Sequence, residues 1–135
     1  MSASLKQSSR IVIQQTFTAS NNGAIHFGQV IGQLASVGVE AYQVDYRAGR
    51  ATYYLPSGDT IDLDFARPEH GIAEVFSVEA LRAAISGAQQ GQVMYPEFKR
   101  LSQQAGCIGY TVWIAGRHVS YVGRRGEVHI ERFPD

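Results

Sequence analysis

The feature that most constrains the fold of this chain is a match of the sequence with itself at a spacing of 68 residues. Glycines and aromatic residues recur in the same order, without a gap, over nearly the whole chain. The identical pairs are Ser9 and Ser77, Gly23 and Gly91, Gly38 and Gly106, Tyr42 and Tyr110, Val44 and Val112, Tyr53 and Tyr121, Gly58 and Gly126, and Phe65 and Phe133. Such self-similarity predicts that one structural unit occurs twice.

The domain organisation follows from this match. We expect a single domain over residues 9–134 that is made of two repeats, residues 9–66 and 77–134, joined by a short connection. Residues 1–8 are expected to form a disordered N-terminal tail. The chain has 135 residues, which is the length of one ordinary domain.

The sequence of each repeat predicts two helices. Ser77 has the side chain of a helix N-cap, and Gly106 is suited to the left-handed cap that ends a helix. Residues 10–19 are ambiguous on their own, because the β-branched run at 11–13 favours a strand. Their alignment with the clear helix that follows Ser77 decides for a helix.

Three strands are expected after the second helix of each repeat, where the hydrophobic period changes to two. A three-stranded meander with two short helices is too thin to bury a sheet face alone. We therefore expect the two antiparallel meanders to associate about a pseudo-twofold axis, with the helices layered on one side. The predicted fold class is α+β, a tandem duplication of an αα-βββ unit.

Composition excludes several classes of protein. The chain has 12 Lys and Arg against 12 Asp and Glu, whereas a nucleic-acid or membrane-surface binder normally carries a basic excess. No apolar run approaches the roughly 20 residues that span a bilayer, and residues 1–10 lack the apolar block of a signal peptide. Cys107 is the only cysteine, which favours a reducing compartment. We expect a cytoplasmic protein.

Two groups of motifs resemble a known bacterial family. The first lies in the earlier repeat and the second near the end of the chain, and the motifs are the runs at 38–39, 42–46, 52–54, 105–110, 116–117, 121–124 and 126–134. They look like the signature of the YbcV/YdfO-like domain-of-unknown-function family, often labelled phage envelope protein. The resemblance implies a small cytoplasmic α+β protein found on chromosomes and prophages. The family has no established activity, and the resemblance supplies no catalytic residue. We expect no cofactor.

His129 and Glu131 are the most informative candidate site residues. They lie two apart on a predicted strand, so their side chains project from one face, and the first repeat has Ile61 and Leu63 at these positions. A carboxylate beside an imidazole can orient it as a base or a ligand. The plainer interpretation, which the sequence favours, is a one-residue shift that makes Val128 and Ile130 the core residues and leaves His129 and Glu131 solvated.

Metal binding and nucleophilic catalysis have weaker support. His118, His129 and Glu131 form a donor set that zinc accepts, but their spacing matches no standard metal site, so we predict no metal. Arg117 or His118 can lie opposite His129 on the neighbouring strand. Cys107 follows a helix C-terminus, where the dipole raises the pKa of a thiol, and we expect it to be a small buried residue.

The last hairpin carries four arginines near several aromatic residues, a combination that can bind single-stranded nucleic acid. Residues 69–135 nevertheless hold seven basic and seven acidic residues, so we do not expect nucleic acid as a partner.

Trp113 stands where the first repeat has Asp45, and a large apolar side chain there needs cover. We expect a homodimer that covers this face; the alternative is that Trp113 lies in the core of the single chain.

The sequence leads to two hypotheses about function. The first is a non-enzymatic binding or regulatory module, homodimeric, whose small ligand or protein partner contacts Trp113, Arg117, His118, His129 and Glu131. The second is a small hydrolase-like or metal-assisted enzyme that uses His129, Glu131 and Arg117. No nucleophile, base and orienting group appear together in the sequence, so the first hypothesis is preferred.

Overall fold

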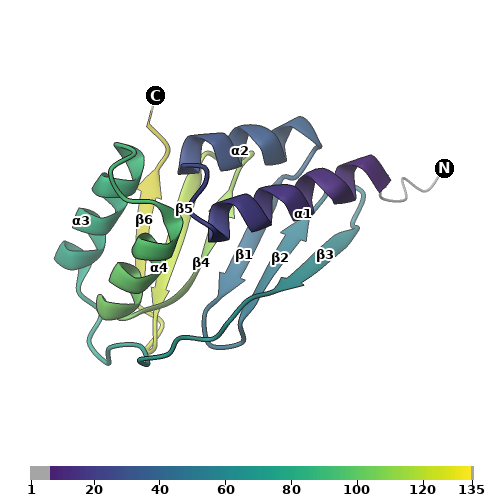
Figure 1. Ribbon diagram of the computed structural model, residues 1–135. Coiled ribbons are helices and arrows are strands. Elements are labelled where there is room, and N and C mark those ends of the chain that lie inside the picture. Colours follow the sequence, from purple (N-terminus) through teal and green to yellow (C-terminus); the bar gives the residue numbers. More distant parts are fainter. Residues whose placement is uncertain (1–6, 135) are drawn as a thin grey trace.

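The computed structural model describes residues 7–134, which form four helices and one six-stranded sheet (Figure 1). The elements of the first half are α1 (Gln7–Asn21), α2 (Phe27–Ser36), β1 (Ala41–Asp45), β2 (Arg50–Tyr54) and β3 (Thr60–Asp64). Those of the second half are α3 (Val78–Gln89), α4 (Tyr95–Gln104), β4 (Cys107–Trp113), β5 (His118–Gly123) and β6 (Val128–Arg132). The predicted α+β class is therefore confirmed.

The helix boundaries have local causes. The Ser77 hydroxyl accepts a hydrogen bond of 3.2 Å from the Ala80 amide and so caps the first turn of α3, as predicted. Pro96 lies in the first turn of α4, where its missing N–H leaves no hydrogen bond unmade. The ambiguous segment at 10–19 is helical and belongs to α1, which buries Ile13 and Thr16. Packing of this face overrides the strand preference of the β-branched run.

The expected N-terminal tail spans residues 1–8. Its first six residues lie outside the described part of the chain, and Gln7 and Ser8 belong to α1.

The sheet has the strand order β3-β2-β1-β4-β5-β6, so the two meanders meet at β1 and β4. Across this junction Tyr42 pairs with Val112 and Val44 with Tyr110, which makes the pairing symmetric about Gln43 and Thr111. All the strand pairs are antiparallel. The association of the two meanders about a pseudo-twofold axis agrees with the expectation from sequence.

The two halves also share their backbone turns. Gly38 and Gly106 end the second helix of each half with φ angles of 86° and 89°. In the first hairpin turn, Gly49 has a φ of 70°, and the matching residue of the second half is Arg117, with a φ of 59°. Arg117 is the one non-glycine residue with positive φ in the described chain. Equal order of elements, equal register and equal turns support the predicted duplication, although a common origin of the halves stays a prediction.

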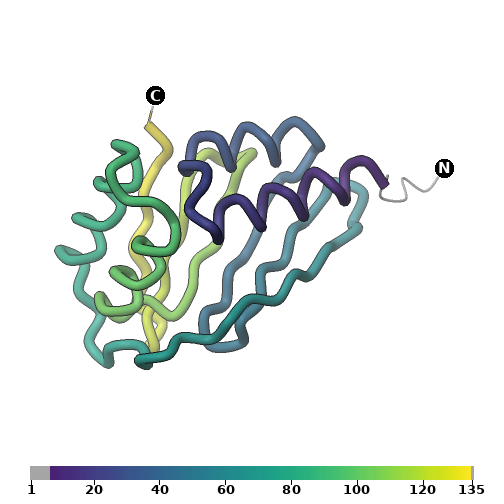
Figure 2. Tube along the Cα trace, viewed as in Figure 1, coloured from purple at the N-terminus to yellow at the C-terminus, as the bar shows by residue number. Residues whose placement is uncertain are grey.

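All four helices cover one face of the sheet and leave the other face open (Figure 1). The segment that connects the halves leaves β3, passes below the ends of the strands and rises to α3 (Figure 2). The core lies between the helices and the sheet and includes Ile13, Leu34, Leu81, Val112 and Cys107 among its most buried residues. Within residues 7–134, no helix has both the length and the hydropathy needed to cross a membrane.

Candidate functional site

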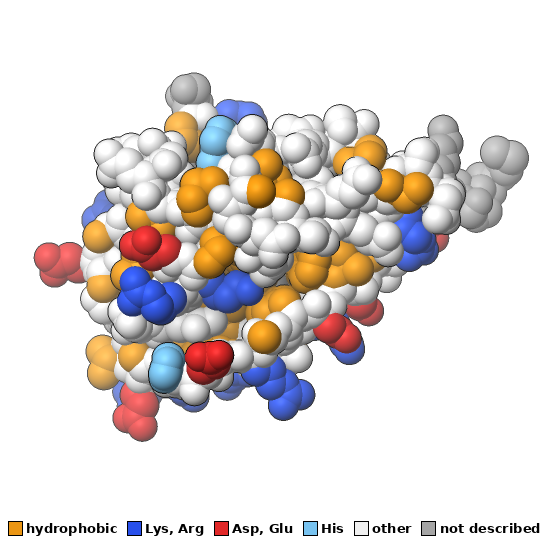
Figure 3. All heavy atoms as spheres, in the orientation of Figure 1, with side chains coloured by type: hydrophobic (Ala, Val, Ile, Leu, Met, Phe, Trp, Pro, Cys, Tyr) orange, Lys and Arg blue, Asp and Glu red, His pale blue; other side chains and the backbone are white. Residues whose placement is uncertain are grey.

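A pocket lies between the helices and the covered face of the sheet, with a volume of about 70 Å³. Most of its lining residues occur in pairs that occupy matching positions of the two halves, so the pocket sits on the pseudo-twofold axis. The aromatic pairs are Phe27 and Tyr95, Tyr42 and Tyr110, Tyr53 and Tyr121, and Phe65 and Phe133. Apolar side chains, with basic ones beside them, reach the surface on this side of the molecule (Figure 3).

The tyrosine pocket, as we call this site, takes its walls from the central strands. Tyr42 of β1 stacks on Tyr53 of β2, with ring centroids 5.2 Å apart. Tyr110 of β4 and Tyr121 of β5 make the matching pair, at 5.6 Å. Both pairs follow from the strand register, because residues directly opposite in an antiparallel ladder share a face. Tyr95 of α4 completes the group of tyrosines that line the pocket.

The hydroxyls of these tyrosines fall into two groups. Tyr110 donates a hydrogen bond of 2.8 Å to Tyr95. The hydroxyls of Tyr42, Tyr53 and Tyr121 have no hydrogen-bond partner among the described residues, although these side chains belong to residues only 5%, 4% and 6% exposed. Every fully enclosed polar side-chain atom of residues 7–134 has a partner. The three free hydroxyls are therefore not fully enclosed, and the residues that carry them line the pocket.

The ionisation of these phenols is set by burial. Removal from water disfavours the charged phenolate and raises the pKa of Tyr42, Tyr53, Tyr110 and Tyr121. The same cause raises the pKa of Tyr95. All of these hydroxyls thus keep their protons at neutral pH, and the three free ones can donate as well as accept hydrogen bonds.

Lys99 of α4 lies beside the tyrosine pocket. Its ammonium is 4.1 Å from the centre of the Phe65 ring and 5.0 Å from that of Tyr95, both of which line the pocket. It donates one hydrogen bond of 2.8 Å, to Asn21 Oδ1. Within residues 7–134 no carboxylate forms an ion pair with it. Burial lowers the pKa of Lys99 to about 8, because no nearby charge compensates the lost hydration.

His129 and Glu131 face the helices, on the same side of the sheet as Tyr121 and Val119, their partners on β5. His129 Nε2 lies 2.8 Å from Glu131 Oε2, and the two side chains are 14% and 31% exposed. Glu131 lines the tyrosine pocket, and the His129 ring stacks on Tyr121 with centroids 6.4 Å apart.

This placement overturns the plainer interpretation of the last strand. Val128 and Ile130 are not core residues, because they are 56% and 57% exposed on the open face. The strand register is that of the first half: His129 pairs with Tyr121 as Ile61 pairs with Tyr53, without a shift in the preceding turn. Polar residues occupy inward positions of β6 because Glu131 and His129 satisfy each other.

The five predicted site residues do not share one face. Trp113 and His118 pair across β4 and β5 on the open face, with ring centroids 6.2 Å apart, whereas His129 and Glu131 face the helices. The structure therefore brings together two pairs, one on each side of the sheet.

Arg117, the fifth predicted residue, lies in the turn between β4 and β5 and is exposed. Its guanidinium lies 5.6 Å from the centre of the Phe133 ring, which lines the pocket, and it donates to the Pro134 carbonyl. A left-handed residue other than glycine is strained by roughly 1 kcal/mol or more. Arg117 adopts this left-handed conformation at the position where the first half has Gly49.

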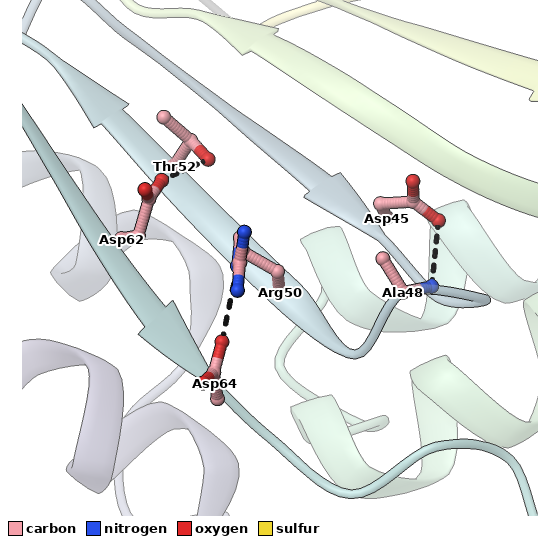
Figure 4. A network of polar contacts seen from close by, with 6 residues as sticks. All are labelled: Asp45, Ala48, Arg50, Thr52, Asp62 and Asp64. Atoms are coloured by element: carbon pink, nitrogen blue, oxygen red, sulfur yellow. Dashed lines mark hydrogen bonds and ion pairs between the residues drawn. The ribbon is translucent and has the colours of Figure 1, made fainter.

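The open face differs between the halves. In the first half it is polar: Arg50 pairs with Asp64 at 3.1 Å, Thr52 donates to Asp62 at 2.6 Å, and Asp45 accepts from the Ala48 amide (Figure 4). In the second half, the positions matching Asp45 and Asp62 carry Trp113 and Ile130.

The exposed side chains Trp113, Val128 and Ile130 form what we call the apolar patch. Trp113 is 43% exposed, so the alternative that it belongs to the core is wrong.

The remaining candidates have structural roles. Cys107 is fully buried, as predicted, and burial raises the pKa of its thiol to about 11. This makes Cys107 a poor nucleophile at neutral pH. No group of three or more His, Cys, Asp or Glu side chains within residues 7–134 is arranged to hold a metal ion.

The sequence did not identify the tyrosine pocket or Lys99. The signal that could have found the pocket is the identical pairs Tyr42–Tyr110 and Tyr53–Tyr121. Lys99 lies within the predicted second helix, at the position that matches Ile31, and no motif marked it.

Fold and site together define a class: an α+β protein with helices on one face of a six-stranded antiparallel sheet and an aromatic pocket between the layers. The chain belongs to the family described as Protein of unknown function (DUF1398), whose profile matches residues 14–132. No curated protein matches the chain. The finer labels that the resemblance suggested, YbcV/YdfO-like and phage envelope protein, stay predictions.

Proposed function

We propose that this protein is a non-enzymatic binding or regulatory module that holds a small molecule in the tyrosine pocket. The observation that carries the proposal is a set of three buried tyrosines, Tyr42, Tyr53 and Tyr121, that line an apolar pocket and whose hydroxyls have no hydrogen-bond partner among the described residues. Convergent polar groups in an apolar cavity are the usual composition of a ligand site.

The size of the cavity limits the ligand. An engineered cavity of about 150 Å³ is large enough to bind benzene. The tyrosine pocket has about 70 Å³, which suits a slim group such as a short alkyl chain. We propose that the remainder of the ligand lies outside this volume, beside Lys99, whose ammonium is over the Phe65 ring.

A thermal-shift screen with uncharged probes, 1-pentanol and pentanamide, tests the proposal. A ligand at 100 times its Kd stabilises the fold by about 2.7 kcal/mol, which raises the Tm by several degrees. The variant Ala88→Phe places a ring at a lining position and should abolish the shift. Ala83→Phe introduces the same side chain at an exposed position of α3 and serves as the control. Equal shifts in both variants would exclude the pocket as the site.

Self-association is a second part of the proposal and involves the apolar patch. Trp113, Val128 and Ile130 lie together on the uncovered side of the second half, which supports cover by another chain. A second copy can supply that cover, because a twofold contact places the same patch on both partners.

Light scattering at micromolar concentration tests this part. The wild type should be a dimer, and Ile130→Asp should be a monomer. Val75→Asp, at an exposed valine outside the patch, should remain dimeric. A monomeric wild type would end the idea of a homodimer.

A small hydrolase-like or metal-assisted enzyme is the alternative, with His129, Glu131 and Arg117 as its residues. The observation in its favour is the 2.8 Å contact between His129 and the pocket-lining Glu131. Loss of a turnover reaction in His129→Ala, with unchanged binding of the same compound, would favour the enzyme.

The free, buried Cys107 supports a proposed cytoplasmic location.

A further inference from the structure

We propose that the ligand of the tyrosine pocket is a small carboxylic acid with a slim apolar tail, and that Lys99 binds its carboxylate. This inference rests on the proposed function and names the chemical class of the ligand. It follows from which donors around the pocket lack a partner and from how the two charged groups beside it are placed.

The ammonium of Lys99 has N–H groups that make no hydrogen bond to the described residues. Of its three N–H groups, one is used by Asn21 Oδ1, and the described residues supply no carboxylate for the others. The ammonium lies over the rings of Phe65 and Tyr95, which line the pocket. A half-buried cation that forms no ion pair with the described residues, and that lies over two lining rings of an apolar cavity, is complementary to an anionic group on a ligand.

The free hydroxyls are compatible with an acidic ligand. Tyr42, Tyr53 and Tyr121 are neutral phenols that can donate to a carboxylate or a carbonyl oxygen. Their placement among apolar side chains strengthens such hydrogen bonds, because little water competes for them. An ammonium ligand would instead find phenol oxygens and ring faces, with the like charge of Lys99 beside the pocket.

Glu131 is the group that argues for a cationic ligand, since its carboxylate lines the pocket. This carboxylate is already engaged, because its Oε2 lies 2.8 Å from His129 Nε2. Among the described residues, Lys99 forms no ion pair with a carboxylate. The charged group beside the pocket that lacks an ion-pair partner is therefore the Lys99 ammonium. Its positive charge favours an acid over an amine as the ligand.

Three probes of equal length separate these possibilities: pentanoate, pentanamide and pentylamine. Their Kd values are measured by NMR titration of the full-length protein at pH 7. Pentanoate should bind about tenfold more tightly than pentanamide, which is the effect expected of one charge-assisted hydrogen bond, and pentylamine should bind most weakly. In Lys99→Met the advantage of pentanoate over pentanamide should disappear, while Lys99→Arg should retain most of it. Glu131→Gln should leave the order unchanged.

The outcomes distinguish this inference from the proposed function. If pentanamide binds as tightly as pentanoate, or if the preference for the acid persists in Lys99→Met, then the role of Lys99 is wrong while the pocket remains a binding site. Tightest binding of pentylamine, lost in Glu131→Gln, would assign the pocket to cations. Failure of all three probes to bind the folded wild type would overturn the proposed function itself.

Discussion

His129 and Glu131 form a hydrogen bond of 2.8 Å on the inner face of β6, at the two positions where β3 carries Ile61 and Leu63. The second half thus carries a polar pair where the first half has an apolar pair, and Glu131 of this pair lines the tyrosine pocket. Such a replacement does not improve stability by itself, because desolvation of partly buried ionisable groups offsets their attraction. We therefore propose that the pair serves ligand binding at the pocket and not the stability of the fold.

The double variant His129→Ile, Glu131→Leu tests that explanation. It restores the residues of the first half and should be at least as stable as the wild type in urea unfolding. Glu131→Leu alone should lose about 1 kcal/mol, because His129 then keeps no hydrogen-bond partner. A double variant that is several kcal/mol less stable would mean that the pair is structural.

A pair of glycine variants tests the match between the halves. Gly38 and Gly106 both have φ near 90°, so alanine at either position should lose about 1 kcal/mol. A Cβ at Gly38 meets nothing within 4 Å, whereas one at Gly106 would collide with backbone atoms of Val75 and Phe76 in the connecting segment. Urea unfolding should therefore show a loss of more than about 2 kcal/mol for Gly106→Ala. Equal losses would contradict this packing of the connection.

Much of this architecture was accessible from the sequence. Glycines mark the ends of the helices, and period-two alternation after Gly38 and Gly106 marks the strands. The helix at 10–19 was predicted only through its alignment with the helix after Ser77, since its own β-branched residues favour a strand.

Which face of the last strand is buried could not be predicted in the same way. In the segment 128–132 apolar and polar residues alternate, and the apolar ones are normally the buried set. Here the register of the first half prevails, so Val128 and Ile130 point outward. The pocket could not be predicted either, because it depends on how tyrosines from both halves pack against α4.

The buried tyrosines predict the behaviour of the protein at alkaline pH. Burial raises the pKa of Tyr42, Tyr46 and Tyr110 well above 10, so the folded state keeps protons that the unfolded chain releases. Their contribution to the free energy of unfolding is complete below pH 10 and falls above it. In a pH titration, the tyrosinate absorbance at 295 nm of the folded protein should rise at a higher pH than that of the urea-unfolded protein. It should rise only when the folded protein unfolds. Overlapping titration curves would show that the phenols are solvated.

Lys99 predicts the opposite trend over a lower range. Its pKa of about 8 in the folded state lies below the ordinary value of 10.5, so between these values the unfolded chain binds the additional proton. The free energy of unfolding of the wild type, taken relative to Lys99→Met, should therefore rise from pH 8 to about 10.5 and then level off. Taking the difference removes the tyrosine and Cys107 contributions that both proteins share. A flat difference would place the ammonium in water and remove its role at the pocket.

A structure of the full-length protein crystallised with pentanoate tests the central claim most directly. The account predicts the alkyl chain between the helices and the sheet, with its carboxylate oxygens within hydrogen-bond distance of Lys99 Nζ and of at least one free hydroxyl among Tyr42, Tyr53 and Tyr121. Pentanoate bound instead on the open face at Trp113, with the tyrosine pocket unchanged, would contradict it.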